Sequence, residues 1–78
     1  MGLDMETDEA WFEVWADRGL QPPYLLMLLG GARPNVFEIF DPKEQSIVHV
    51  ASSYQEARFW LSEDEYEPVG DRTAMEGD

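Results

Sequence analysis

Residues 36–62 have the sequence VFEIFDPKEQSIVHVASSYQEARFWLS, and the spacing of their apolar side chains changes partway along from strand-like to helical. In the first part, apolar residues alternate along two short runs, which is typical of strands buried on one side. Asp41-Pro42 separates the runs and favours a tight turn, because proline is preset for the second position of such a turn. Further on, Ser53 and Glu56 form a capping box at the start of a run with helical spacing. The stretch therefore predicts strands over residues 36–40 and 46–51 and a helix over residues 54–62.

Two more strands are expected upstream of this hairpin. Trp11–Ala16 is rich in strand-forming residues, and Tyr24–Leu29 is a continuous apolar run bounded by Pro22-Pro23 and Gly30-Gly31. Short connections between successive strands predict an antiparallel meander. The segment 66–69 is compatible with a short fifth strand at an edge, where proline is tolerated, or with an extended tail. The expected fold is α+β: a four-stranded antiparallel β-meander, with a possible short fifth strand, packed on one face by a single C-terminal α-helix.

Charge is concentrated at the two ends of the chain. The 78 residues include 17 acidic and 5 basic side chains, for a formal net charge of −12. Residues 1–10 carry −4 and residues 61–78 carry −6, whereas residues 11–60 carry only −2. Segments of high charge and low hydrophobicity are typical of flexible chain ends. We therefore expect a flexible acidic N-terminal segment over residues 1–9, a single α+β domain over residues 10–69 and a flexible acidic C-terminal tail over residues 70–78.

The composition argues against several classes of protein. A strongly acidic chain is repelled by the phosphates of nucleic acid and by anionic membranes, so direct binding to either is not expected. The absence of cysteine rules out disulfides and thiolate metal sites and fits a reducing compartment. The longest apolar run, Tyr24–Leu29, is far too short to cross a bilayer, and the N-terminus has no signal-peptide pattern. The expected location is the cytoplasm, of a bacterial type.

Catalytic, metal and cofactor signatures are also missing from the sequence. His49 is the only histidine, and a half-buried position on a strand explains it better than catalysis, since no nucleophile is expected beside it. The acidic run 63–67 lacks the spacing of a calcium loop and fits a solvated helix end. Gly30-Gly31 has no lysine or hydroxyl residue at phosphate-loop spacing and fits a turn. We therefore expect no enzyme activity, no metal and no cofactor.

Alternation along the strands assigns the side chains to two faces of the expected sheet. The natural interior is the face without charged residues, beneath the helix residues Ala57, Trp60 and Leu61. Which side of Tyr24–Leu29 contributes to this interior is not decided by the pattern. The strand residues assigned to the interior are Phe12, Val14, Phe37, Ile39, Val48 and Val50.

The second face is also apolar, because Glu13 and Glu38 are its only charges. One helix covers one face of a four-stranded sheet and not both. An exposed apolar patch that contains aromatic residues often marks an interface. The alternatives are that a chain end folds back over this face, or that single exposed aromatic residues carry no function. The residues expected to bind a protein are Trp11, Trp15, Val36, Phe40, Ile47 and His49.

Two functions remain compatible with this pattern. The first is a non-enzymatic protein–protein interaction or accessory module, whose partner is another protein or a second copy of the chain. The second is an acidic inhibitor that imitates nucleic acid and binds a basic DNA- or RNA-binding protein. Mimicry needs carboxylates fixed on a rigid surface, whereas most acids here lie in end segments expected to be flexible. The interaction module is therefore the leading hypothesis.

Overall fold

The computed structural model describes residues 10–75, which form one antiparallel sheet of five strands and one helix. The α+β class and the antiparallel sheet expected from the sequence are confirmed, and a fifth strand is present. The strands are β1 (Trp11–Asp17), β2 (Tyr24–Gly30), β3 (Phe37–Asp41), β4 (Ser46–Ala51) and β5 (Glu67–Ala74), and the helix is α2 (Tyr54–Glu63).

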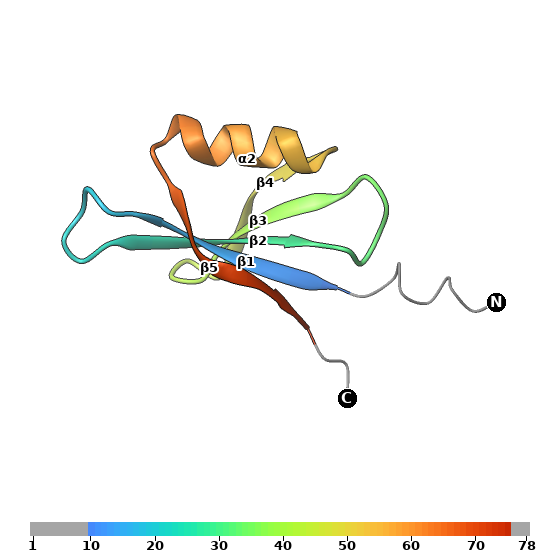
Figure 1. Cartoon of the computed structure of the whole chain (residues 1–78), viewed down its shortest axis with the longest axis horizontal. Coiled ribbons are helices and arrows are strands. Elements are labelled where there is room, and N and C mark those ends of the chain that lie inside the picture. The colour runs from blue at the N-terminus through green and yellow to red at the C-terminus, as the bar shows by residue number, and fades with distance from the viewer. Residues whose placement is uncertain (1–9, 76–78) are drawn as a thin grey trace.

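The spatial order of the strands is β4-β3-β2-β1-β5. The first four strands each pair with the next along the chain, as in a meander, and β5 pairs with the free side of β1. The helix α2 connects one edge strand, β4, to the other edge strand, β5, so the chain crosses the width of the sheet on one side (Figure 1). This crossing decides which side chains of the sheet lie beside the helix.

Local hydrogen bonds fix the start of α2. Ser53 has an extended backbone, and its hydroxyl accepts a hydrogen bond from the backbone N–H of Glu56 at 3.1 Å, as the capping box predicts. The Glu56 carboxylate contacts Ser52 instead of Ser53, and accepts from the hydroxyl at 2.8 Å and from the backbone N–H at 3.2 Å. These two bonds from Ser52 lower the pKa of Glu56.

The strand β5 is longer than the sequence pattern indicates. Residues 70–74, which were assigned to a tail, belong to β5 and pair with β1 as far as Ala74. The register between the two strands shifts opposite Glu13, and Gly70 adopts a φ of 75° among the extra residues of this bulge. Pro68 lies on this edge strand, where proline is tolerated. The expectations for residues 1–9 and 76–78 fall outside the described residues.

The buried apolar cluster combines residues of the sheet with residues of α2. Its largest fully buried side chains are those of Trp15, Leu28, Ile39 and Leu61, each no more than 1% exposed. A cluster of this size is small, as is usual in a chain of this length. The cluster is completed by Leu26, Ala51 and Ala57, and the half-buried Trp11, Tyr24, Phe37, Tyr54, Trp60 and Tyr66 pack against it.

Candidate functional site

Two rows of cross-strand partners identify the two faces of the sheet. Glu13, Leu28, Ile39 and His49 are successive partners across β1, β2, β3 and β4, and Leu28 and Ile39 are fully buried. Residues of α2 contact both ends of this row, because Tyr54 bonds to Glu13 and Trp60 stacks on His49. We call this side the helix face. The adjacent row, formed by Val14, Met27, Phe40 and Ile47, points to the opposite side, which we call the open face.

The faces of β1 are the reverse of those expected from the sequence. In β4, His49 and Val50 are reversed, whereas Ile47 lies on the side expected, because the register shifts between Ile47 and His49. Trp15 is 1% exposed within the core, and Trp11 is half-buried beside Tyr54, with ring centroids 5.9 Å apart. Their assignment to an exposed surface was therefore wrong. Conversely, Phe12, Val14, Val48 and Val50 were expected in the interior. Phe12, Val14 and Val50 lie on the open face, and Val48, at the register shift of β4, is 43% exposed. Only in β3 was the interior correct, since Phe37 and Ile39 face the helix.

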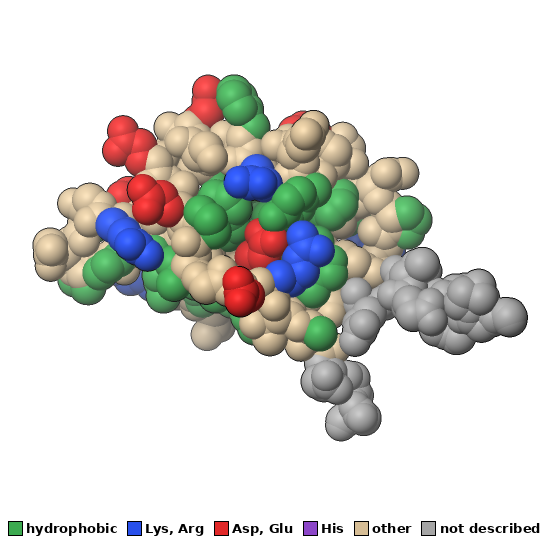
Figure 2. All heavy atoms as spheres, in the orientation of Figure 1, with side chains coloured by type: hydrophobic (Ala, Val, Ile, Leu, Met, Phe, Trp, Pro, Cys, Tyr) green, Lys and Arg blue, Asp and Glu red, His purple; other side chains and the backbone are tan. Residues whose placement is uncertain are grey.

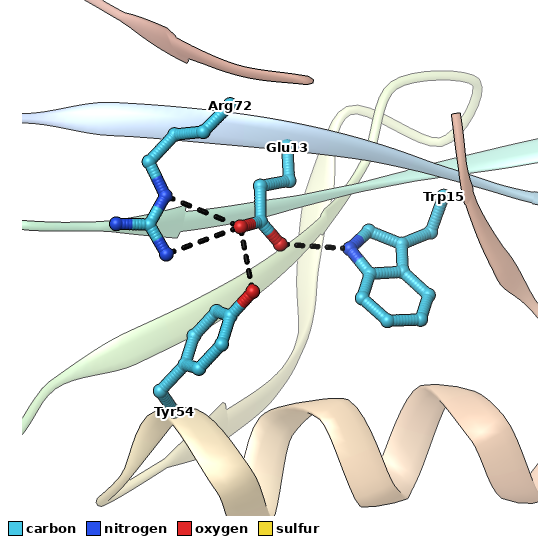
Figure 3. Close-up of polar contacts among 4 residues, drawn as sticks. All are labelled: Glu13, Trp15, Tyr54 and Arg72. Atoms are coloured by element: carbon cyan, nitrogen blue, oxygen red, sulfur yellow. Dashed lines mark hydrogen bonds and ion pairs between the residues drawn. The ribbon is translucent and has the colours of Figure 1, made fainter. Parts of the chain in front are cut away.

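The error arose because Glu13, a charged residue, was taken to exclude its face from the interior. Glu13 is only 9% exposed, and its carboxylate is compensated by donors distant in the sequence (Figure 3). Its Oε1 accepts from the Trp15 indole N–H at 3.1 Å. Its Oε2 accepts from the Tyr54 hydroxyl at 2.7 Å and from Arg72, whose Nε and Nη2 lie 3.2 and 3.1 Å away. A buried carboxylate is tolerated when it is paired and hydrogen-bonded in this way.

Of the four other residues expected to bind a protein, three are assigned to a face of the sheet by the strand register, and Val36 lies just before β3. His49 lies on the helix face, where its ring stacks on Trp60 with centroids 4.6 Å apart. Phe40 and Ile47 are cross-strand partners on the open face, and Ile47 is 43% exposed. Val36 is half-buried and immediately precedes β3. Of the six predicted residues, Phe40 and Ile47 are thus placed on the open face by the strand register.

The open face is apolar across the sheet, and α2 lies on the other side (Figure 1). Its most exposed apolar side chains are Val50 at 56% and Leu25 at 46%. At the paired positions of this face only Glu38 and Glu67 carry charge, and Glu38 lies 3.8 Å from Arg33. The half-buried apolar residues of this face are Phe12, Val14, Met27, Leu29 and Phe40. Apolar side chains therefore predominate at the paired positions of the open face.

A tyrosine–aspartate pair lies at the other end of the helix face. The Tyr24 hydroxyl donates to Asp41 Oδ2 at 2.6 Å, and the Asp41 carboxylate also accepts from the backbone N–H groups of Lys43 and Glu44. The hydrogen bond to Asp41 raises the pKa of Tyr24 to about 12 from its ordinary 10.0. The same bond from Tyr24 lowers the pKa of Asp41. The pair closes the turn after β3 and holds it against β2.

This pair predicts a pH-dependent difference in stability between the wild type and the Tyr24→Phe variant. The folded state raises the pKa of Tyr24. The stability that the protonated Tyr24 hydroxyl provides is therefore complete below pH 10.0 and is lost as the pH rises through about 12. The folded state lowers the pKa of Asp41. The stability that the ionised Asp41 carboxylate provides is therefore present above pH 3.8 and is lost as the pH falls further. Urea unfolding of both proteins across the pH range tests this. A difference in unfolding free energy that stayed constant from neutral pH to about pH 12 would contradict it.

Within residues 10–75, no group of three or more histidine, aspartate and glutamate side chains is arranged to hold a metal ion. Nor does that part of the chain contain a helix of the length and apolarity needed to cross a membrane. Comparisons of the sequence with protein-family models, with curated proteins and with solved structures find no match. The structure itself gives the class of the protein, which is an α+β fold with a five-stranded antiparallel sheet.

Proposed function

We propose that this protein is a non-enzymatic interaction module that associates with a second copy of itself through the open face. The observation that carries the proposal is the row Val14, Met27, Phe40 and Ile47, which is apolar from β1 to β4 and points away from α2. Two antiparallel sheets commonly pack face to face, with interdigitated apolar side chains, about 10 Å apart. An apolar face is complementary to itself, so a two-fold symmetric pair needs no other matching chemistry.

The distribution of charge supports a second copy as the occupant. Two chains that each carry −12 repel one another over most of their surfaces. Among the acids of residues 10–75, only Glu38 and Glu67 lie at paired positions of the open face, and Glu38 is partly compensated by Arg33. It is therefore the surface where two copies approach with the least repulsion. Salt screens the remaining charges, so it should strengthen the pairing.

The small size of the chain also supports self-association. The buried apolar cluster contains only a few large side chains, and the chain has no cysteine for a disulfide. Small domains usually require a disulfide, a metal or a partner surface for stability. Pairing through the open face would bury Leu25 and Val50, which are about half exposed in the single chain. Burial of such side chains contributes about 25 cal/mol per Å² of apolar surface removed from water.

A charge placed at the centre of the open face tests the proposal. Met27→Glu is expected to weaken the dimer by at least about 100-fold, roughly 2.7 kcal/mol, because the interface would then bury an unpaired carboxylate from each copy. The matched control is Phe59→Glu, which makes the same change at an apolar residue of α2 that is 64% exposed. Analytical ultracentrifugation over a range of concentrations and salt measures the association directly.

The expected result is a wild-type dimer that persists in Phe59→Glu, dissociates in Met27→Glu and tightens as salt is added. Circular dichroism of the Met27→Glu protein establishes that the monomer remains folded. The proposal is overturned if the wild type stays monomeric at all concentrations. It is also overturned if Phe59→Glu dissociates the protein as strongly as Met27→Glu does.

Imitation of nucleic acid remains a second candidate, because part of the acidic C-terminal segment has regular structure. Glu63 ends α2, and Glu67 and Asp71 belong to β5, so these carboxylates are attached to defined elements. The position of Asp41 argues against this imitation, because its side chain is buried and hydrogen-bonded to Tyr24 and so adds nothing to an acidic surface. Salt separates the two functions, because it weakens the capture of a basic protein and strengthens pairing of two acidic chains.

A further inference from the structure

A hollow of about 500 Å³ lies at the end of the sheet beside the start of α2 and is distinct from the open face. Its walls include three aromatic side chains, Trp11, Phe37 and Tyr54, whose ring centroids are 5.9–6.3 Å apart. The volume falls within the range of about 300–1,000 Å³ found for small-molecule pockets. We propose that this hollow binds a small planar carboxylate, with its ring among the aromatic walls and its carboxylate on Arg33 and Arg72.

The two arginines make this hollow electrostatically unlike the rest of the molecule. The chain has only five basic residues against 17 acidic ones, and two of the five line this hollow, together with no acidic residue. Arg33 belongs to the loop between β2 and β3, and Arg72 belongs to β5. Figure 2 shows basic, acidic and hydrophobic side chains close together between α2 and the strands nearest the viewer. A carboxylate placed here would meet guanidinium donors, which match its planar geometry.

Arg72 is held in position for this role before any ligand arrives. Its guanidinium carbon lies 3.7 Å from the centroid of the Trp11 ring, and two of its nitrogens bond to Glu13. The third nitrogen, Nη1, is directed away from Glu13 (Figure 3), and within residues 10–75 no hydrogen bond or ion pair is made by it. A donor fixed by its own neighbours loses little conformational freedom when it binds.

The backbone around the hollow explains how its aromatic walls fit over the sheet. A side chain at Gly30 would place its Cβ 2.5 Å from the Trp11 ring and 3.0 Å from Phe37, so only glycine leaves room for both rings. Gly31 and Asn35 both have left-handed backbone conformations, with φ values of 84° and 60°. These residues bend the loop that carries Arg33 and Pro34 to the mouth of the hollow.

The charge balance favours a monoanion over a phosphate dianion. Glu13 compensates Arg72, and Glu38 lies 3.8 Å from Arg33, so the four groups together are neutral. A monoanion adds a single negative charge to this neutral group, whereas a dianion adds two in a chain of −12 and is therefore repelled more strongly. The aromatic walls favour a flat ring over a saturated one, because aromatic groups pair at centroid distances of about 4.5–7 Å.

Titration of the full chain with benzoate tests the proposal, followed by the chemical shifts of the Trp11 indole N–H and the Arg33 side chain. A ligand of this size is expected to bind with a dissociation constant of about 1 mM. Arg33→Met should weaken binding about tenfold, as expected for one charge-assisted hydrogen bond. The matched control is Arg18→Met, which removes the same charge from the exposed turn after β1. It should change the affinity by less than about twofold.

Three further probes separate the parts of the proposal. Cyclohexanecarboxylate has the charge without the planar ring, and benzyl alcohol has the ring without the charge. Inorganic phosphate, used at a pH above its second pKa, is a dianion without a ring. Each is expected to bind at least about fivefold more weakly than benzoate. The proposal is overturned if benzoate produces no saturable change at about ten times the expected dissociation constant. It is also overturned if any of the three probes binds as tightly, or if Arg18→Met and Arg33→Met weaken binding equally.

Discussion

Trp15→Ala is expected to destabilise the folded chain by about 3–5 kcal/mol, the largest effect of any single truncation in this structure. The Trp15 side chain is 1% exposed, and its removal leaves a cavity among the buried residues of the sheet and α2. It also removes the indole N–H that donates to Glu13. Domains have stabilities of roughly 0.05–0.15 kcal/mol per residue, or about 4–12 kcal/mol for a chain of 78 residues. The variant should therefore lose a large fraction of its stability and unfold at a much lower urea concentration than the wild type.

Urea unfolding followed by far-ultraviolet circular dichroism measures this loss. The control is Phe59→Ala, because Phe59 is an aromatic residue of α2 that is 64% exposed. It is expected to change stability by less than about 0.5 kcal/mol. Equal losses in the two variants would mean that Trp15 is not in the interior, which would contradict the assignment of the two faces.

Glu13→Ala is expected to cost about 2–4 kcal/mol, although it removes a charge from a partly apolar interior. The substitution leaves the Trp15 indole N–H and the Tyr54 hydroxyl without their acceptor, and each buried donor left unpaired costs about 1–3 kcal/mol. Arg72 adds less, since its side chain is 45% exposed and can be hydrated again. The result would show that the carboxylate joins β1, β5 and α2.

A double-mutant cycle with Tyr54→Phe separates this network from a general loss of packing. The coupling between Glu13 and Tyr54 is expected to be about 1–3 kcal/mol, because their 2.7 Å hydrogen bond involves a charged acceptor. Glu38→Ala is the matched control: its pair with Arg33 is 3.8 Å long and the Arg33 side chain is 68% exposed, so the loss should be below about 0.5 kcal/mol. A coupling near zero would show that the donors find other partners when Glu13 is removed.

Much of the fold could be predicted because its signals are local. Alternating apolar residues and short turns indicate β1 to β4, and Ser53 with Glu56 marks the start of α2. The length of β5 could not be predicted, because Glu67, Gly70 and Asp71 are poor strand formers that are ordered by pairing with β1. Pairing between segments so far apart in sequence has no local signature.

The faces of the sheet could not be predicted because both sides of β1 and β4 are apolar. In β1 the charge of Glu13 was the only apparent discriminator, and it favoured the wrong side, whereas the charge of Glu38 favoured the correct side of β3. Its partners Tyr54 and Arg72 lie 41 and 59 residues away in the sequence, so their compensation of the charge was not visible. The spacing of Trp11, Glu13 and Trp15 on one side of a strand was the available signal, since tryptophan N–H groups need acceptors when buried.

The central claim is that α2 covers one face of the sheet while the other face is buried only when two copies pair. Attenuation of methyl and tryptophan signals by a soluble paramagnetic agent, recorded at low and high protein concentration, tests it most directly. Leu28, Ile39, Leu61 and the Trp15 indole should be protected at both concentrations, whereas Leu25, Met27 and Val50 should be attenuated when dilute and protected when concentrated. Attenuation of Trp15 as strong as that of Leu25, or no change at Met27 with concentration, would contradict the account.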